Sequence, residues 1–379
     1  MDCKGPKYRQ MHRTSGHENA PLPHRKGAES NPLDLQDFPC QRSSIAEQRF
    51  HPKVAVLLLL AVAALLVILA ASPLWAEKQE SLDQWLADLK TEALAQGISP
   101  KTLDRAFRDF RPIARVIELD ASQPEYTLTL EQYLGRVVRK SRVVRGRDKL
   151  TRYASLLENV YQRYGVQSRF LVSLWGIETE FGRVTGKFPV IQAIATLAYD
   201  SRRSSYFRRE LIQALRIADE GHVPLGKMRG SWAGAMGQLQ FMPSAFHDFG
   251  VDFNQDGRVD IWNDLEDAFA SAANYLSRSG WSRGHTWGRE VKLPPSLDTA
   301  MLGLETQKSL SEWQSLGVRR AGGEDLPKNP DLLASILQPD GKKGRAFAVY
   351  DNFRAILAWN KSDYFGIAVG SLADQIVER

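Results

Sequence analysis

Residues 173–182 read Ser-Leu-Trp-Gly-Ile-Glu-Thr-Glu-Phe-Gly and end a long segment of helical apolar spacing that begins near Leu156. The spacing predicts that Glu178 lies at or near the end of a helix. On that helix Trp175 and Phe181, three residues before and after, would share the face of Glu178. An aromatic wall removes water from a carboxyl and raises its pKa toward the range that a general acid needs. For an isolated glutamate, a solvated or arginine-paired helix end is the commoner case.

The size of the chain allows a large core. It has 379 residues, of which 43% are hydrophobic and 25% charged, so one big domain or two smaller ones can form. This charged fraction is ordinary for a soluble globular protein. The net charge is +6, and no dense Lys/Arg block follows residue 53. A nucleic-acid partner is therefore not expected.

Residues 54–71 form an uninterrupted run of Val, Ala, Leu and Ile, preceded by Arg49 and Lys53. This length is at the lower edge of a membrane span and long for a signal-peptide core. The basic side should stay in the cytoplasm, so the rest of the chain should reach the periplasm. Residues 54–76 are predicted to be either a cleaved signal ending near Ala76 or an uncleaved inner-membrane anchor.

Residues 1–53 are polar, rich in Pro, Ser, Arg and His, and lack apolar periodicity. This composition predicts a disordered leader. The two cysteines, Cys3 and Cys40, both lie in it. The exported part is therefore expected to have neither a disulfide nor a thiol nucleophile.

From residue 77 onward, apolar residues recur mostly at helical spacing, without a β-meander or an internal repeat, so the fold class is predicted to be mainly α. Residues 290–345 are richer in Pro, Gly and Ser and predict loops with short strands. The basic run from Arg136 to Lys149 predicts a solvated helix face or a connector.

Residues 230–243, Gly-Ser-Trp-Ala-Gly-Ala-Met-Gly-Gln-Leu-Gln-Phe-Met-Pro, crowd small side chains together. Such a run indicates tight helix packing or a backbone held against a ligand. Ser231 and Gln240 are the polar members best suited to bond a ligand. Capping or surface roles are the commoner alternative for such residues.

Residues 252–263, Asp-Phe-Asn-Gln-Asp-Gly-Arg-Val-Asp-Ile-Trp-Asn, follow the EF-hand calcium-loop pattern up to its ninth position. The candidate oxygen ligands at loop positions 1, 3, 5 and 7 are Asp252, Asn254, Asp256 and the carbonyl of Arg258. At the twelfth position Asn263 replaces the expected Glu. One of the acidic residues that follow could close the site: Asp264, Glu266 or Asp267. We expect structural Ca²⁺ and no organic cofactor; a metal-free turn is the alternative.

Three further stretches are distinctive. They are Ala-Thr-Leu-Ala-Tyr-Asp-Ser-Arg-Arg at 195–203, Ala-Asn-Tyr at 273–275, and the segment 350–362, which contains Tyr-Asp-Asn-Phe and Trp-Asn-Lys-Ser. From about residue 78 to its end, the chain resembles the lytic murein transglycosylases of the membrane-bound B type, glycoside hydrolase family 103. The resemblance implies a lysozyme-like α core with an N-terminal helical part, a small extra subdomain and an EF-hand-like calcium loop.

The implied division places the N-terminal helical part at 77–150 and the lysozyme-like core at 151–290, with the calcium loop at 252–267. The small subdomain and a C-terminal glycan-binding segment then occupy 291–379. The implied partner is the glycan strand of peptidoglycan, and we expect a monomer.

The resemblance also implies cleavage of the β-1,4 bond between N-acetylmuramic acid and N-acetylglucosamine without water, giving 1,6-anhydromuramoyl products. Glu178 would act as acid and then as base. A hydrolytic muramidase would need a second carboxylate. Glu180 is a poor candidate for that role, and Asp200 stays open. A non-catalytic peptidoglycan-binding scaffold is the alternative from another class.

By family position, Ser231 should bond Glu178, and Gln240 should contact the sugar near the cleaved bond. The residues expected to stack on or bond the glycan are Tyr133, Tyr275, Trp359 and Asn360. Trp359 and Phe365 stand where tyrosine is familiar, so each keeps an aromatic face and loses a hydroxyl. The implied calcium ligands are Asp252, Asn254, Asp256, the Arg258 carbonyl and Asp267.

Overall fold

The computed structural model describes residues 81–122, 128–200, 203–329 and 332–378. The predicted leader (1–53) and the predicted signal or anchor (54–76) lie outside these residues. Among the helices that are described, none is long and apolar enough to cross a membrane.

Helices dominate the described chain, which confirms the mainly α prediction. Those of the first half are α2 (Leu82–Ala95), α3 (Pro100–Ala106), α4 (Ala114–Ala121), α5 (Leu130–Val137), α6 (Lys140–Arg152), α7 (Ala154–Tyr164), α8 (Ser168–Thr179) and α9 (Val190–Tyr199). Those that follow are α10 (Ser204–Asp219), α11 (Pro243–Phe249), α12 (Leu265–Arg278), α13 (Leu310–Ser315), α14 (Asp351–Trp359) and α15 (Asp363–Val377).

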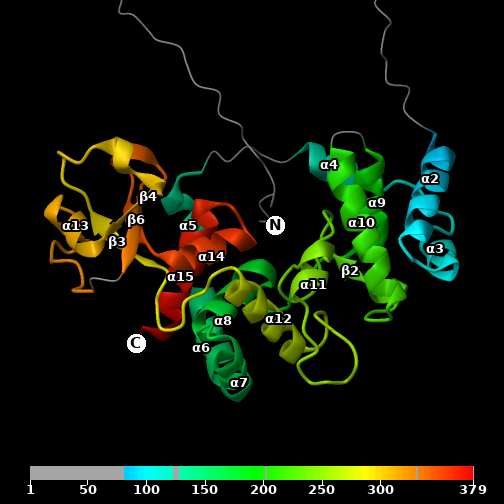
Figure 1. Cartoon of the computed structure of the whole chain (residues 1–379), viewed down its shortest axis with the longest axis horizontal. Helices are drawn as coiled ribbons and strands as arrows, with labels where there is room; N and C mark the ends of the chain where they lie inside the picture. The colour runs from blue at the N-terminus through cyan, green and yellow to red at the C-terminus, as the bar shows by residue number, and fades with distance from the viewer. Residues whose placement is uncertain (1–80, 123–127, 201–202, 330–331, 379) are drawn as a thin grey trace, which may run out of the picture. The chain divides into compact units, whose positions relative to one another are not determined.

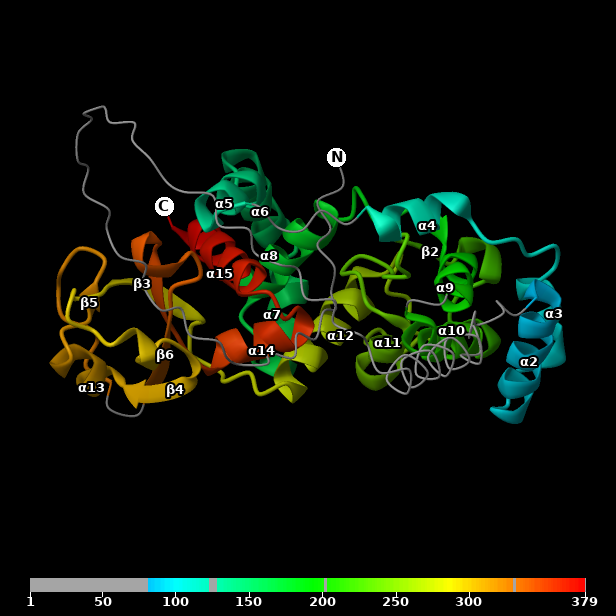
Figure 2. The same cartoon turned by 90° about the horizontal axis from the view of Figure 1, so that it is seen from above.

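Helix α8 is the centre of one group of helices and contacts α6, α7, α12 and α15 (Figures 1 and 2). Its residues from Phe170 to Gly176 are all buried, as expected of a helix that is apolar on every side. The Ser173 hydroxyl donates to the Val369 carbonyl of α15 at 2.7 Å, which satisfies a polar group inside this core. The helix that carries Glu178 in its last turn is thus held from several sides.

The apolar segment from Leu156 to Trp175 is two helices and not one, contrary to the sequence prediction. Gly165 follows α7 in the left-handed conformation (φ 75°), which closes that helix before α8 begins. Glycine tolerates this backbone at the end of a helix, whereas other residues do so at a cost. Apolar periodicity continues across the break because both helices pack into the same core.

A second group of helices gathers around α10, which contacts α3, α9 and α11. At its end the Asp219 carboxylate accepts hydrogen bonds from the Ser99 and Thr102 hydroxyls of the α3 N-terminus, at 2.5 and 2.6 Å. Ser99 also caps α3 by accepting from Thr102 N. The early helices are thereby tied to the middle of the chain.

Residues 288–349 form a five-stranded antiparallel sheet, which covers the stretch 290–345 for which loops and short strands are predicted and extends slightly beyond it. Its strands are β3 (Gly288–Lys292), β4 (Gly303–Ser309), β5 (Arg319–Arg320), β6 (Leu333–Leu337) and β7 (Ala346–Val349), in the order β4-β6-β7-β3-β5. Val349 pairs with Gly288 on one side and with Ser335 on the other. Trp313, Ile336 and Tyr350 belong to a second cluster of buried residues beside this sheet.

Candidate active site

Glu178 occupies the last turn of α8 and is half-buried, so the predicted position at a helix end is confirmed. The indole Nε1–H of Trp359, the last residue of α14, donates to Glu178 Oε1 at 2.9 Å. The two residues are 181 positions apart in the chain. Sequence reasoning assigned Trp359 to glycan stacking and missed this contact with the carboxylate.

The aromatic surroundings of Trp359 come from two further segments. Its ring centroid lies 5.0 Å from that of Phe241 and 4.9 Å from that of Tyr275 on α12. The Tyr275 hydroxyl donates to the Ala358 carbonyl at 2.7 Å, which ties α12 to the end of α14. Trp359 is only 6% exposed, so little of its ring is left for a sugar, and its indole N–H is directed to Glu178.

Phe181 does not share a helix face with Glu178, contrary to the prediction. The helix ends at Thr179, and Glu180 and Phe181 adopt left-handed backbone conformations (φ 54° and 60°). Phe181 turns into the core, where its ring meets Trp175 edge-on at 5.6 Å. The Trp175 indole donates to Gln238 Oε1 at 2.8 Å. The apolar spacing of a sequence does not show at which residue a left-handed turn ends the helix.

Gln238 is a functional neighbour that the sequence did not single out. Its side chain accepts from Trp175, and its Nε2 donates to the Trp262 carbonyl at 2.9 Å. Its own carbonyl accepts from the Thr179 hydroxyl at 2.7 Å. Gln238, which lies in the small-residue stretch 230–243, therefore joins the end of α8 to the acidic stretch that contains Trp262. The sequence offers two glutamines in this run and no signal that distinguishes them.

Residues 231–242 form no helix, so tight helix packing is not what their small side chains serve; instead a backbone packs closely against this stretch at Gly186. That glycine has φ 100°, and a Cβ on it would lie 2.0 Å from the Gly230 carbonyl group and 2.5 Å from Ser231 N. The two-stranded pairing of β1 (Phe188–Pro189) with β2 (Arg229–Gly230) brings these backbones together. A backbone approach this close leaves no room for a side chain.

Ser231 and Gln240 are both buried and both hold the local backbone. Ser231 Oγ accepts from Ala235 N at 2.9 Å, and its expected bond to Glu178 stays a prediction. Gln240 has φ 59°, and its Nε2 donates to the Thr185 and Gly237 carbonyls at 3.0 and 3.1 Å. Its expected contact with the sugar also stays a prediction.

The remaining predicted glycan residues lie around α5 and α15. Tyr133 of α5 packs against Tyr364 of α15, with ring centroids 5.7 Å apart. Burial, together with a hydrogen bond to Asp340, raises the pKa of Tyr364 to about 12. Asn360 Oδ1 accepts from Ser362 N at 3.1 Å in the turn between α14 and α15. Phe365 is only 5% exposed, so the expected stacking face is inside the core and that expectation is corrected.

Glu180 is bound by arginines of the basic run, which is therefore more than a solvated helix face. The donors are Arg139 at 2.6 Å, Arg142 and Arg145. Arg142 is buried and also donates to the Val137 carbonyl. The oxygens of a carboxylate held by several guanidinium groups are occupied by those charge-assisted hydrogen bonds. Glu180 is thus unsuited to act as a second catalytic carboxyl.

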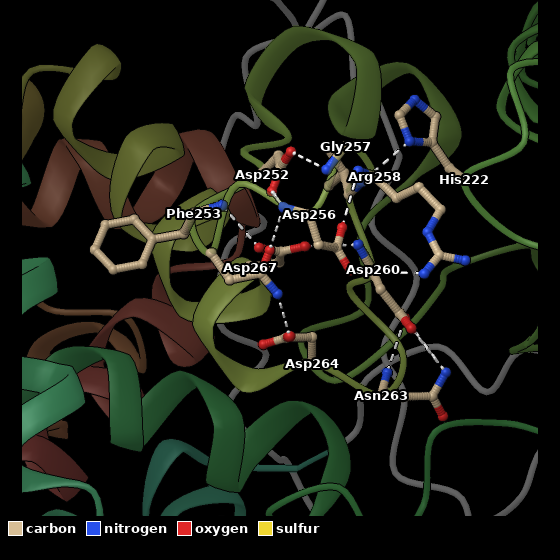
Figure 3. A network of polar contacts seen from close by, with 12 residues as sticks. His222, Asp252, Phe253, Asp256, Gly257, Arg258, Asp260, Asn263, Asp264 and Asp267 are labelled. Atoms are coloured by element: carbon tan, nitrogen blue, oxygen red, sulfur yellow. Dashed lines mark hydrogen bonds and ion pairs between the residues drawn. The ribbon is translucent and has the colours of Figure 1, made fainter.

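The acidic loop, residues 252–267, is folded by hydrogen bonds from its own backbone (Figure 3). Asp256 N donates to Asp252 Oδ1 and to Asn254 Oδ1, at 3.1 and 2.9 Å. Gly257 N donates to Asp252 Oδ2 at 2.8 Å, and Gly257 has φ 90°. Arg258 N donates to Asp256 Oδ1 at 3.0 Å. The loop curls around the predicted side-chain oxygens.

Asp267 of α12 braces the acidic loop from inside and is 1% exposed. Its carboxylate accepts from Phe253 N and Asp260 N, both at 2.8 Å. Burial raises the pKa of Asp267; these two hydrogen bonds oppose the rise, and nearby Asp264 and Asp252 add to it. Among the described residues, no three His, Cys, Asp or Glu side chains converge closely enough to hold a metal.

Comparison with known proteins begins with the family model for the transglycosylase SLT domain, which matches residues 81–374. The membrane-bound lytic murein transglycosylase B of Escherichia coli is 34% identical over 232 residues, covering 59% of this chain and 61% of that protein. The chain thus spans about three fifths of the length of that relative.

Two solved structures extend the likeness. SltB3 of Pseudomonas aeruginosa, in complex with NAG-anhNAM-pentapeptide, is 44% identical with a TM-score of 0.76, covering 78% of this chain and 80% of SltB3. The E. coli lytic transglycosylase Slt35 in complex with calcium is 30% identical with a TM-score of 0.65, covering 77% of this chain and 91% of Slt35. With a family model matched over most of its length and a fold shared with these enzymes, the chain belongs to the transglycosylase SLT domain family.

Proposed function

We propose that this protein is a lytic transglycosylase that cleaves the β-1,4 bond between N-acetylmuramic acid and N-acetylglucosamine in peptidoglycan. The observation that carries the proposal is the half-buried Glu178 carboxyl, held by an indole N–H at the end of α8. Family membership and the muropeptide bound to SltB3 support the substrate class.

In the proposed reaction, protonated Glu178 donates its proton to the glycosidic oxygen as the bond from that oxygen to C1 of the muramoyl residue breaks. The resulting carboxylate then takes the proton of the C6 hydroxyl while the C6 oxygen bonds to C1 and closes the 1,6-anhydro ring. Glu178 ends protonated, and no water is consumed. Because an indole N–H can only donate, Trp359 can stabilise the carboxylate without taking its proton.

The glycan is proposed to lie along residues around this carboxyl. Ser231 would orient Glu178, and Gln240 would contact the sugar at the cleaved bond. The other proposed contacts are Tyr133, Tyr275, Asn360 and the small exposed part of Trp359. The contact between Tyr275 and the end of α14 supports their shared role.

The decisive test of catalysis is Glu178→Gln, with the exposed Glu118→Gln as a matched surface control. Removing the acid and base should lower the release of muropeptides from purified peptidoglycan by about 10³-fold. The control should keep its activity. Unchanged cleavage by Glu178→Gln would favour a second carboxyl and refute the assignment; a wild-type protein that binds peptidoglycan without releasing products would favour the scaffold.

Mass spectrometry of one digest separates the two chemistries. We expect 1,6-anhydromuramoyl ends, which lack the mass of one water. Reducing muramoyl ends as the main product would indicate hydrolysis. Since arginines hold Glu180, a hydrolase would have to use another carboxylate, and Asp200→Asn would then be the variant to assay.

We further propose that the acidic loop binds Ca²⁺ through Asp252, Asn254, Asp256, the Arg258 carbonyl and Asp267. These oxygens fit calcium in chemistry and order. Burial is the main cause of the raised pKa of Asp267, and the neighbouring Asp264 and Asp252 add to it, so a cation would relieve part of that rise. Each carboxylate oxygen has a second lone pair, so the backbone hydrogen bonds do not exclude a cation. The calcium complex of Slt35 supports the proposal. Bound Ca²⁺ would supply structural charge neutralisation.

The proposed location is the periplasm, reached through residues 54–76 as a signal or as an inner-membrane anchor. The proposed division is a helical part at 77–150, a lysozyme-like core at 151–290, and a subdomain with a glycan-binding segment at 291–379. The separate buried cluster beside the sheet supports the last division. Cell fractionation of the full chain tests the location, and a protein found in the cytoplasm would refute it.

A further inference from the structure

The chain leaves α8, which ends at Thr179, through three consecutive left-handed residues. Their φ angles are 54° at Glu180, 60° at Phe181 and 80° at Gly182. Glycine takes such a conformation freely, whereas residues with a Cβ take it at a cost. Two such residues in a row therefore require a surrounding structure that holds them.

The outer anchor of this turn is the Glu180 carboxylate. Its three arginine donors are spaced by three residues and therefore reach it from one face at the start of α6: Arg139, Arg142 and Arg145. Arg142 is buried, whereas the Arg139 side chain is 50% exposed. Burial lowers the pKa of Arg145, and the neighbouring Arg183 and Arg139 lower it further. Three arginine cations surround the single negative charge of Glu180, so the carboxylate is firmly bound to the start of α6.

The inner anchor is the Phe181 ring, which lies over Gly176. A Cβ on Gly176 would come within 2.7 Å of Phe181 Cζ, so this packing needs glycine there. The backbone closes in the same place: Glu180 N donates to Gly176 O at 3.1 Å, and Phe181 N donates to Trp175 O at 3.2 Å. The last turn of α8, which carries Glu178, is therefore closed by the two left-handed residues.

We propose that Glu180 is a positioning residue for Glu178. Its arginine cluster holds the left-handed turn, and the turn fixes the end of α8 so that the Glu178 carboxyl meets the Trp359 indole. The backbone conformation favours glycine at position 180, so backbone preference gives no reason for glutamate. This inference rests on the proposed catalytic role of Glu178.

The test compares Glu180→Gly with Glu180→Gln in the full chain. Glycine removes the conformational cost and the charge together, whereas glutamine keeps the cost and the shape and removes the charge. Arg139→Gln removes the half-exposed member of the cluster and leaves Arg142 and Arg145 in place, so it tests the same contact in a protein that should fold readily. Glu290→Gln, which removes a carboxylate bound to Arg345 in the sheet, is the matched control.

We expect kcat on peptidoglycan fragments to fall about 10- to 100-fold in both Glu180 variants with KM nearly unchanged, because a misplaced acid loses turnover before binding. Arg139→Gln should lose less, and Glu290→Gln nothing. The ¹⁵N-indole resonance of Trp359, assigned with Trp359→Phe, should shift in the Glu180 variants. A folded Glu180→Gly protein with full kcat and an unchanged Trp359 resonance would overturn the proposal.

The resonance also separates this inference from the proposed function. An active Glu178→Gln variant would refute the catalytic assignment, whereas the Trp359 resonance reports the position of the carboxyl without any activity. If neither Glu180 variant folds, unchanged kcat and an unchanged resonance in Arg139→Gln would overturn the positioning role.

Discussion

Two irregular segments of this protein satisfy their carboxylates by opposite means. The post-helix turn, residues 179–186, and the acidic loop, residues 252–267, both turn through left-handed residues. In the turn, arginines of the neighbouring helix surround one carboxylate. In the loop, backbone N–H groups donate hydrogen bonds to the aspartates. Among the described residues, the ion pair of these aspartates is the one between Arg258 and Asp256, at 3.6 Å.

The difference teaches that a hydrogen bond can satisfy a carboxylate without cancelling its charge. Guanidinium groups do both, so the turn is complete without an external ion. Backbone N–H groups are dipoles and leave the net charge in place, and burial and the neighbouring aspartates raise the pKa of Asp267. The proposed cation would therefore add to the stability of the loop, whereas the turn needs none.

The largest effect should follow from Gly186→Ala, which breaks the turn where it meets Gly230. The added Cβ would overlap the Gly230 carbonyl group at 2.0 Å and would also require φ 100°. We expect the free energy of unfolding to fall by about 3 kcal/mol or more. Urea denaturation measures it. Gly97→Ala is the control, because Gly97 has φ 86° and nothing within 4 Å of its Cβ position; an equal loss in both would exclude the clash.

Calcium removal should affect the acidic loop next most strongly. At a concentration about 100-fold above Kd, a cation that binds only the folded state stabilises it by about 2.7 kcal/mol. Chelation should therefore lower Tm in the wild type and in Glu180→Gln alike, since the turn uses no ion. Asp252→Asn should lose the response. A wild-type Tm that is insensitive to both chelator and added Ca²⁺ would contradict the calcium proposal.

Gly176→Ala should loosen the turn from inside. The new methyl would press on the Phe181 ring at 2.7 Å, and overpacking of this kind costs about 1–3 kcal/mol, against about 1 kcal/mol gained in helix propensity. We expect a net loss of about 1 kcal/mol in urea denaturation. Gly135→Ala in α5 is the matched helical control, with nothing within 4 Å. That control should stabilise the protein; stabilisation of both variants would mean that Phe181 moves freely.

The smallest effect concerns Asp219, a carboxylate held by neutral hydroxyls. Burial alone would raise the pKa of Asp219, but hydrogen bonds from Ser99 and Thr102 outweigh it and lower the pKa. The contribution of Asp219 to the free energy of unfolding is therefore complete above about pH 4, the ordinary pKa of a carboxyl group. It is lost as the pH falls through the lower pKa that Asp219 has in the folded protein. Asp219→Asn should cost about 1 kcal/mol at pH 7. The difference from wild type should shrink below pH 4, and a constant difference would contradict the assignment.

Much of the helical architecture could be predicted from the sequence, because amphipathic periodicity is a local property of the chain. The position of Glu178 at a helix end followed from that periodicity. The curl of the acidic loop followed from the spacing of Asp252, Asn254 and Asp256, because short polar side chains bond the backbone two or more residues on. Sequence motifs also identified the family, which the SLT domain match confirms.

Contacts between distant segments were decided only in the tertiary structure. Trp359 meets Glu178 across 181 positions, and Gln238 joins three segments, although no local pattern indicates either set of contacts. The arginines of α6 read as a solvated face because their periodicity suits one, yet Glu180 draws them together. The burial of Phe365 could not be predicted either, because it depends on packing between distant segments. Local spacing specifies which face a side chain occupies, and only packing specifies which partner that face meets.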